Sequence, residues 1–299
     1  MLQLTLILVV LLGVIPLMLG MVAVAFWGRR NADLPPALLF HSVPLQANWA
    51  LSSIDKAQFS GFMDGLHQHG WQSVTVRDYT ALVEKKQPLP DHSFVLTFDD
   101  AYEDVYLNAL PILTQCNFKA TIFVISSYIG RQADWDVYTP QRHMSVAQIR
   151  AAHALGHEIG SHTVTHANLP FLSTVEVLRE LRDSRHALED LLGCAVTSVS
   201  FPFGSWNERI WQCARDAGYV AATIYRGAPR VQERMLIPVQ GVYRVDTLDD
   251  LICKLTGGGA CRGAFVRTRI LPHFAKGSAI WKDRLNYGVW RELFDRNVS

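Results

Sequence analysis

The sequence predicts an α/β protein with a parallel sheet, either open or closed into a barrel. Short runs rich in Val, Ile and Phe recur between residues 37 and 223, and the segments between them have helical patterns. Runs of this length and composition are typical of strands that are buried on both faces. Their alternation with helices is typical of parallel β-α-β units. A chain of 299 residues can bury one large core or two smaller ones.

Seven strands are expected in these apolar runs. In chain order they are ALLF (37–40), SVTV (73–76), SFVLTF (93–98), ATIFVI (120–125), HEIGS (157–161), SVSFP (198–202) and YVAAT (219–223). The intervening segments are expected to be helical, most clearly residues 173–193. There Ser173 and Glu176 have the spacing of a capping box, and Gly193 is placed to end the helix. Ser145 is expected to begin another helix.

The N-terminal residues 1–27 contain no charged side chain. This run is long enough to span a bilayer and longer than the apolar region of a signal peptide. We therefore expect a single transmembrane anchor, followed by a polar linker at residues 28–36. A cleaved signal segment is the alternative, because residues 23–25 (AVA) resemble a cleavage site. Arg29 and Arg30 favour a cytoplasmic location for the rest of the chain by the positive-inside rule.

The charge balance and the cysteines exclude several classes of protein. The chain has 28 Lys and Arg against 27 Asp and Glu, which gives no reason to expect a nucleic-acid partner. Residues 257–299 form a basic C-terminal extension whose dispersed charges favour a solvated face over contact with anionic lipid or polymer. The five cysteines are odd in number and lack metal-binding spacing. We expect them to be buried and unpaired, with a Cys253–Cys261 bridge as the less favoured alternative.

Polar side chains follow several predicted strands at their carboxyl ends, where parallel α/β proteins place functional groups. His41 follows the first run, Asp99 and Asp100 follow the third, and His162 and His166 follow the fifth. Each of them alone is explained by packing or by helix capping. Together they predict a metal site with acid/base partners. Two adjacent carboxylates repel each other, and a cation between them and the histidines relieves that repulsion.

The predicted ligands suit a catalytic zinc ion. Two histidines and one carboxylate leave open positions around Zn²⁺, as a catalytic rather than a structural site requires. Such an ion lowers the pKa of a water molecule toward neutrality, and the second carboxylate can accept the proton. His157 begins its strand rather than ending it, so we expect it to be structural.

Three segments occur in the order LTFDDAYEDVY (96–106), GHEIGSHTVTHANL (156–169) and SFPFGSWNERIWQCARDAGYVAAT (200–223). They resemble three motifs of the polysaccharide deacetylases, carbohydrate esterase family 4, which contain the NodB homology domain. ALLFHSV (37–43) resembles the start of the branch that deacetylates poly-N-acetylglucosamine. The resemblance implies a distorted (β/α) barrel over residues 37–256. It also implies metal-dependent hydrolysis of N-acetyl groups on amino sugars, with release of acetate.

The resemblance implies a role for each site residue. Asp99 matches the general base and Asp100 matches the carboxylate ligand of the metal. His162 and His166 match the two histidine ligands.

The remaining roles come from the first and the last of these motifs. Phe203 matches the residue whose backbone amide binds the oxyanion, and His41 matches the acid that the first strand supplies. The family often has an Arg shortly before the Pro-aromatic pair to orient the base, whereas this chain has Val199 and Ser200 there. His273 is a weaker match to the acid of other branches, because it lies beyond the last predicted strand.

The expected substrate is an N-acetylated amino-sugar polymer at the surface of a bacterial-type cell. We therefore place the domain outside the cytoplasm despite Arg29 and Arg30. Trp135 and Trp206 suit either stacking on sugar rings or ordinary packing. One alternative is a membrane-associated amidohydrolase that acts on a small or lipid-linked N-acyl sugar. Another is a non-catalytic carbohydrate-binding protein of the same fold, which the complete set of site residues disfavours.

Overall fold

The computed structural model describes residues 34–46, 50–132, 141–225, 233 and 235–257. These residues lie in one compact unit, Ala32–Gly258. The predicted anchor, Trp135, His273 and nearly all of the C-terminal extension lie outside the described residues. The predicted domain boundaries stay predictions.

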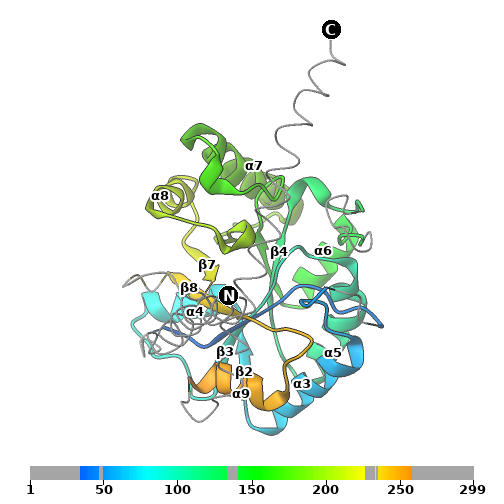
Figure 1. Ribbon diagram of the computed structural model, residues 1–299. Coiled ribbons are helices and arrows are strands. Elements are labelled where there is room, and N and C mark those ends of the chain that lie inside the picture. Colours follow the sequence, from blue (N-terminus) through cyan, green and yellow to red (C-terminus); the bar gives the residue numbers. More distant parts are fainter. Residues whose placement is uncertain (1–33, 47–49, 133–140, 226–232, 234, 258–299) are drawn as a thin grey trace, which may run out of the picture. The chain divides into compact units, whose positions relative to one another are not determined.

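A closed parallel barrel forms the centre of the unit (Figure 1). Its strands are β1 (Ala37–Phe40), β2 (Gln72–Val74), β3 (Ser93–Phe98), β4 (Thr121–Val124), β5 (Glu158–Ser161), β6 (Ser198–Ser200), β7 (Ala221–Tyr225) and β8 (Leu236–Gly241). β1 pairs with β8 on one side and with β3 on the other, so seven strands close into a ring. β2 pairs with β3 outside the ring. The prediction of a parallel α/β fold is confirmed, in its barrel form.

Two strands differ from the sequence prediction. β2 was expected to be buried on both faces, but Gln72 is exposed and its two successors are half-buried, because β2 is an edge strand. It also ends early, since Thr75 caps the following helix with its side chain. β8 was not predicted. Pro238 interrupts its strand signal, and a proline cannot donate a hydrogen bond to a sheet.

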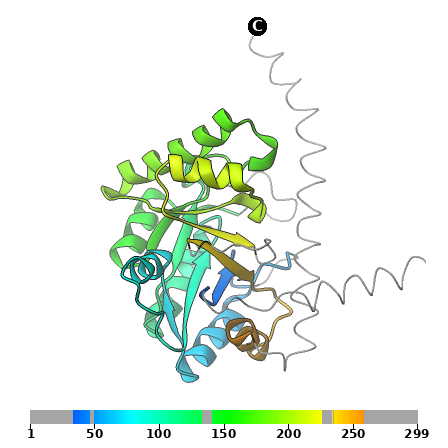
Figure 2. The same ribbon diagram turned by 90° about the vertical axis from the view of Figure 1, so that its left-hand side faces the viewer.

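Helices surround the barrel (Figures 1 and 2). They are α3 (Lys56–Gln68), α4 (Val76–Glu84), α5 (Leu110–Gln115), α6 (Val146–Ala154), α7 (Thr174–Leu192), α8 (Glu208–Asp216) and α9 (Leu248–Thr256). A π-helical turn, η2 (Val105–Ala109), precedes α5. The 3₁₀ turns are η3 (Ser126–Tyr128), η4 (Leu169–Phe171) and η5 (Pro202–Gly204). The predicted capping box of Ser173 and Glu176 is confirmed, and Gly193 ends α7 with a φ of 71°.

Alternate residues of the strands divide between two hydrophobic clusters. In β1, Leu38 and Phe40 belong to the larger cluster, which also contains buried residues of α3, α5 and α7. That cluster therefore lies between the barrel and its helices. Ala37 and Leu39 belong to the smaller cluster, which faces the barrel interior. This alternation follows from the two-residue period of a strand.

The amino end of the barrel contains a buried carboxylate. Glu158 begins β5, and its carboxylate accepts hydrogen bonds from the Thr121 hydroxyl (2.7 Å), the Ser198 hydroxyl (2.7 Å) and the Arg77 amide (2.8 Å). The Arg77 amide lies in the first turn of α4, where the helix dipole favours a negative charge. Burial raises the pKa of Glu158, and these hydrogen bonds oppose the shift. The burial of this carboxylate is therefore compensated within the fold.

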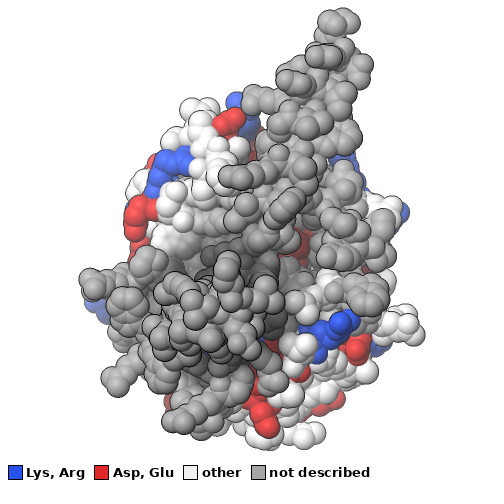
Figure 3. All heavy atoms as spheres, viewed as in Figure 1, with Lys and Arg blue, Asp and Glu red and all other residues white. Residues whose placement is uncertain are grey.

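Two further sequence expectations can be compared with the described residues. Cys253 is disulfide-bonded, so the expectation that the cysteines are unpaired is wrong for this residue. Cys116 and Cys213 are free and buried, as expected, whereas Cys194 is free but exposed, which contradicts the expected burial. Within the described ranges, no helix combines the length and apolar character that crossing a bilayer requires. On the face shown in Figure 3, acidic and basic side chains of the described residues are interspersed.

His157 is structural, as expected, and it gives the fold a testable pH dependence. Its ring is fully buried, and Nδ1 accepts a hydrogen bond from the Ala120 amide (3.2 Å), which requires a neutral ring. Burial, followed by the nearby charge of Lys119, lowers the pKa of His157 to about 4. The unfolded chain therefore binds this proton near pH 6.5, and the folded chain does so only near pH 4. The stabilisation is present above pH 6.5 and is lost as the pH falls toward 4.

We expect a His157→Asn variant to lose part of this acid sensitivity. Asn Oδ1 can accept the same hydrogen bond and cannot be protonated. Between pH 6.5 and pH 4, the free energy of unfolding of the wild type should fall more steeply than that of the variant, by up to about 1.4 kcal/mol per pH unit. Urea unfolding at several pH values measures both slopes, and parallel curves would contradict the assignment.

Candidate active site

In several strands, every second side chain faces the barrel interior, and this alternation continues past the carboxyl end of the strand, where the interior-facing side chain is polar. In β1, the interior residue Leu39 is followed two positions later by His41. The interior-facing positions at the ends of β3, β5 and β6 are occupied by Asp99, His162 and Ser200, respectively. The barrel therefore brings together side chains that are far apart in the sequence.

Three predicted ligands converge. One donor atom from each of Asp100, His162 and His166 lies within 4.8 Å of the others. Nε2 of His162 and Nε2 of His166 each lie 3.5 Å from Oδ1 of Asp100. This set of two imidazoles and one carboxylate is the donor set that catalytic zinc sites use.

The orientation of His162 supports a cation at this point. Its Nδ1 lies 2.8 Å from the Ser200 carbonyl oxygen, so Nδ1 carries the proton and Nε2 has a lone pair. Burial lowers the pKa of His162 to about 3, so the ring is neutral at pH 7. A lone pair on Nε2 thus faces a carboxylate oxygen of Asp100, and a metal ion between them would relieve the repulsion. The residues present therefore fit a divalent metal ion.

Backbone strain is concentrated around the ligands. Five residues that are not glycine have left-handed backbone here: Asp100 (φ 68°), Ala101 (φ 51°), Thr163 (φ 68°), His166 (φ 59°) and Phe203 (φ 59°). Each costs about 1–2 kcal/mol, and more for a β-branched or bulky side chain. Such strain persists only where surrounding contacts fix the conformation.

Two sets of hydrogen bonds fix these strained segments. The ring of His143 is buried and its Nδ1 lies 2.7 Å from the Asp100 carbonyl oxygen. Glu180, on α7, accepts hydrogen bonds from the amides of Val164 and Thr165, both at 2.9 Å, and from the Thr165 hydroxyl at 2.7 Å. A helix outside the barrel therefore anchors the loop between the two ligand histidines.

Asp99 lies beside the ligands in an environment that suits a general base. Its carboxyl is buried, and Oδ2 lies 3.9 Å from Nε2 of His162. Burial, followed by the neighbouring charge of Asp100, raises the pKa of Asp99 well above its usual value. A raised pKa increases the affinity of a carboxylate for a proton, which base catalysis near neutral pH needs.

His41 faces the same site from β1. A charge on His41 would lower the pKa of His162, so the two rings are close enough to interact. The loop that follows His41 is fixed by the Ser42 hydroxyl, which donates to Asp104 (2.6 Å). The Asn108 side chain also donates to the Val43 carbonyl (2.8 Å). Burial lowers the pKa of His41 to about 4. The sequence analysis matched His41 to an acid, which needs a proton, whereas this lowered pKa favours the neutral ring at pH 7.

Aromatic side chains border the site. The Phe203 ring meets the His166 ring edge-on, with centroids 4.6 Å apart, so the Phe203 side chain lies against a predicted ligand. The predicted role of its backbone amide stays a prediction. Gly204 follows, and a Cβ atom there would lie only 1.9 Å from the Tyr225 ring. Trp206 is half-buried and packs against the larger hydrophobic cluster. Its predicted contact with substrate stays a prediction.

Sequence reasoning missed three residues at the site. Two of them, Ser200 and Tyr225, are the last residues of β6 and β7, and both face the barrel interior. Burial is the main cause of a raised pKa of Tyr225. The charge of Tyr243 and then those of Asp99 and Asp100 raise it further. The alternation of strand residues could have identified both Ser200 and Tyr225. His143 lies outside the regular strands, and no pattern in the sequence indicates that it binds the Asp100 carbonyl.

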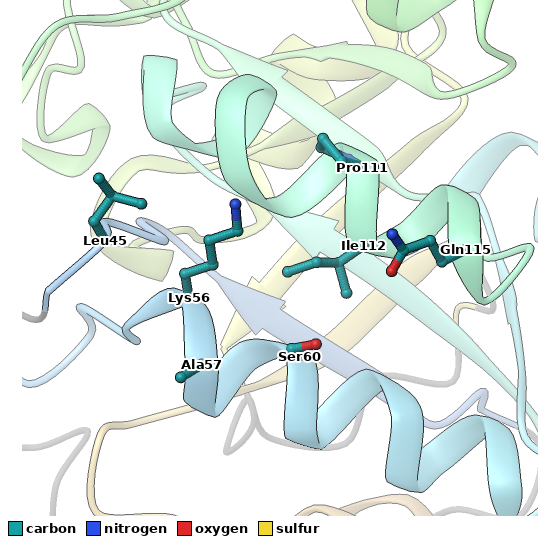
Figure 4. A pocket seen from close by; sticks show the side chains of 7 residues that line it. All are labelled: Leu45, Lys56, Ala57, Ser60, Pro111, Ile112 and Gln115. Carbon is teal, nitrogen blue, oxygen red and sulfur yellow. The ribbon is translucent and has the colours of Figure 1, made fainter.

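A separate hollow of about 490 Å³ lies between α3 and α5, outside the barrel (Figure 4). Lys56 and Ser60 line it from α3, and Ile112 lines it from α5. Of the predicted site residues that the structure describes, none borders this hollow.

Comparisons with known proteins relate the chain to one family. Residues 86–222 match the model of a family described as polysaccharide deacetylase. YxkH of Bacillus subtilis (strain 168) is 28% identical over 184 residues, which are 62% of each chain. The poly-beta-1,6-N-acetyl-D-glucosamine N-deacetylase of Staphylococcus aureus (strain MRSA252) is 23% identical over 171 residues, 56% of this chain and 59% of that protein. The chain thus spans about three fifths of the length of these curated relatives.

A solved structure has the same fold. The Streptococcus pyogenes deacetylase PplD, in complex with acetate, aligns with a TM-score of 0.65 at 21% sequence identity. The alignment covers 74% of this chain and 98% of that one. At this identity the likeness is one of fold.

Glu180 provides a test of how the ligand loop is held. We expect Glu180→Ala to weaken zinc binding about 10- to 100-fold, because the loop loses its anchor while every ligand remains. Asp183→Ala is the matched control, since Asp183 is an exposed acid on the same helix. Competition with a chromophoric chelator measures the affinity of both variants. Equal affinities would show that Glu180 does not hold the site.

Proposed function

Because residues 86–222 match the polysaccharide deacetylase family, we propose that the chain is a metal-dependent hydrolase that removes N-acetyl groups from N-acetylhexosamine units of a cell-surface polysaccharide. The convergence of Asp100, His162 and His166 beside the buried Asp99 carries this proposal. The S. aureus relative, named for an amino-sugar polymer, supports the choice of substrate class.

The protein's own residues account for each proton and charge. A divalent ion, most simply Zn²⁺, held by Asp100, His162 and His166 would polarise the acetyl carbonyl and acidify a water molecule. Asp99 takes the proton from the water as it attacks the acetyl carbon. The Phe203 amide donates a hydrogen bond to the oxygen that becomes negative, a contribution of about 3 kcal/mol in comparable sites.

The second half of the reaction needs an acid. When the carbon–nitrogen bond breaks, the nitrogen must gain a proton to leave as an amine, and acetate remains. His41 faces the site and supplies this proton. Because burial lowers the pKa of His41, the ring has to gain a proton before it donates one, and the proton that Asp99 takes from the water is the one that the site supplies.

We also propose that the domain works outside the cytoplasm of a bacterial-type cell, attached to the membrane through residues 1–27. The disulfide bond of Cys253 supports an oxidising location. A polymer substrate at the cell surface requires the same location. A reporter fused to the C-terminus would measure the orientation directly.

Asp99 is the residue that tests the reaction itself. With Asp99→Asn, acetate release from N-acetylglucosamine oligomers should fall about 10²- to 10⁴-fold, because no base accepts the proton from water. Zinc affinity should persist, since Asp100 and both histidines remain. Wild-type turnover in this variant would refute the proposed function.

The role of His41 can be separated from that of Asp99 by the choice of leaving group. With His41→Asn, hydrolysis of the N-acetyl amide should fall about 10²- to 10⁴-fold, because an amine cannot leave without a proton. Hydrolysis of 4-nitrophenyl acetate should change little, since nitrophenolate leaves as an anion. Equal losses on the two substrates would rule out the acid role and leave His41 as a binding or structural residue.

A further inference from the structure

Ser200 contacts the candidate site through two different groups. Its hydroxyl donates a hydrogen bond to Oδ2 of Asp99 (3.0 Å), and its carbonyl oxygen lies 2.8 Å from Nδ1 of His162. Ser200 is buried at the end of β6, and both contacts join it to residues from other strands. One residue therefore touches both the proposed base and a proposed metal ligand.

The hydroxyl is important because Asp99 has little else to orient it. Among the residues that the structure describes, the Ser200 hydroxyl is the hydrogen-bond donor to the Asp99 carboxyl. Oδ1 of Asp99 is buried without a partner. The Ser200 bond thus fixes the rotation of the carboxyl about its last torsion, which is otherwise soft. It leaves the lone pairs of Oδ1 for a proton.

The carbonyl has a separate function. It holds the proton of His162 on Nδ1, which leaves the Nε2 lone pair facing Asp100. This contact belongs to the backbone, so a change in the Ser200 side chain does not remove it. The two contacts can therefore be separated by mutation.

We infer that Ser200 is the positioning residue for the base, because its hydroxyl bonds the Asp99 carboxyl. The inference rests on the proposed function, because it assigns Ser200 a role in the same reaction. A neutral hydroxyl orients Asp99 without adding a positive charge next to the metal ligands. Ser200 itself does not contact the reacting atoms.

Ser198 provides a matched control within the same strand. It lies two positions earlier on the same interior face, and its hydroxyl donates to the buried carboxylate of Glu158 (2.7 Å). Burial raises the pKa of both acceptor carboxyls, Glu158 and Asp99. The two serines thus make the same kind of bond at opposite ends of the barrel, and only that of Ser200 is at the candidate site.

The experiment compares Ser200→Ala, Ser200→Thr and Ser198→Ala in the full-length chain. For each protein we would measure kcat and KM for acetate release from N-acetylglucosamine oligomers, hydrolysis of 4-nitrophenyl acetate, zinc affinity and Tm. Ser200→Ala should lower kcat on both substrates about 10- to 100-fold. Its KM and zinc affinity should stay close to wild type, because the carbonyl remains. Ser200→Thr should restore kcat, and Ser198→Ala should lower Tm without lowering kcat.

Four results would overturn the inference. The first is a Ser200→Ala protein with wild-type kcat. The second is a loss of zinc affinity in Ser200→Ala that matches the loss of activity, since the residue would then act through the metal site. The third is an equal loss of kcat in Ser198→Ala. The fourth is a Ser200→Thr protein with wild-type Tm and the activity of the alanine variant.

The failure of the proposed function gives a different pattern. A wild-type protein that binds zinc and hydrolyses 4-nitrophenyl acetate, but releases no acetate from the oligomers, contradicts the proposed substrate. The ratio of wild-type to Ser200→Ala ester hydrolysis then still tests the positioning role, because that reaction also requires water activated by Asp99.

Discussion

Closure of the barrel by β1 is the constraint on which the site depends. β1 pairs with both β3 and β8, so the interior-facing side chains of all seven ring strands are directed toward one axis. Because successive residues of a strand alternate between faces, a polar residue placed two positions beyond the last interior-facing residue of a strand emerges at the mouth of the barrel. His41 and Asp99 reach the site in this way from neighbouring strands. An open sheet with the same sequence would not direct them toward a common point.

The barrel interior is polar at both ends and apolar between them. The buried carboxylates at the two ends have different partners. At the amino end, Glu158 is bonded by two hydroxyls and by an amide of α4, so its burial is compensated within the fold. At the carboxyl end, Asp99 has the Ser200 hydroxyl, and Asp100 faces two imidazoles. The strained backbone of Asp100 and His166 lies at this end as well. The fold thus concentrates incomplete compensation and strain at the end where a ligand can enter, as functional sites commonly do.

Much of this arrangement follows from the sequence, and the remainder depends on relations between strands. The parallel fold, the long helix and the convergence of Asp100, His162 and His166 could be predicted, because each rests on local periodicity or on position at a strand end. β8 could not, since Pro238 removes the local signal and the strand is held by its neighbours on both sides.

The supporting residues of the site were missed for a similar reason. The bond between Ser200 and Asp99 joins residues 101 positions apart, and that between His143 and Asp100 joins a residue outside the regular strands to a backbone carbonyl. A sequence pattern identifies the groups that carry chemistry, because their types are unusual. It does not identify a serine whose importance comes from what it faces across the barrel. Burial favours the neutral form of His41 and of His162, and two carboxyls lie beside them. These side chains therefore supply negative charge and lone pairs to the site, and neither ring supplies a positive charge. This group of side chains therefore suits a cation, and the Ser200 hydroxyl distinguishes the two carboxyls because it bonds Asp99.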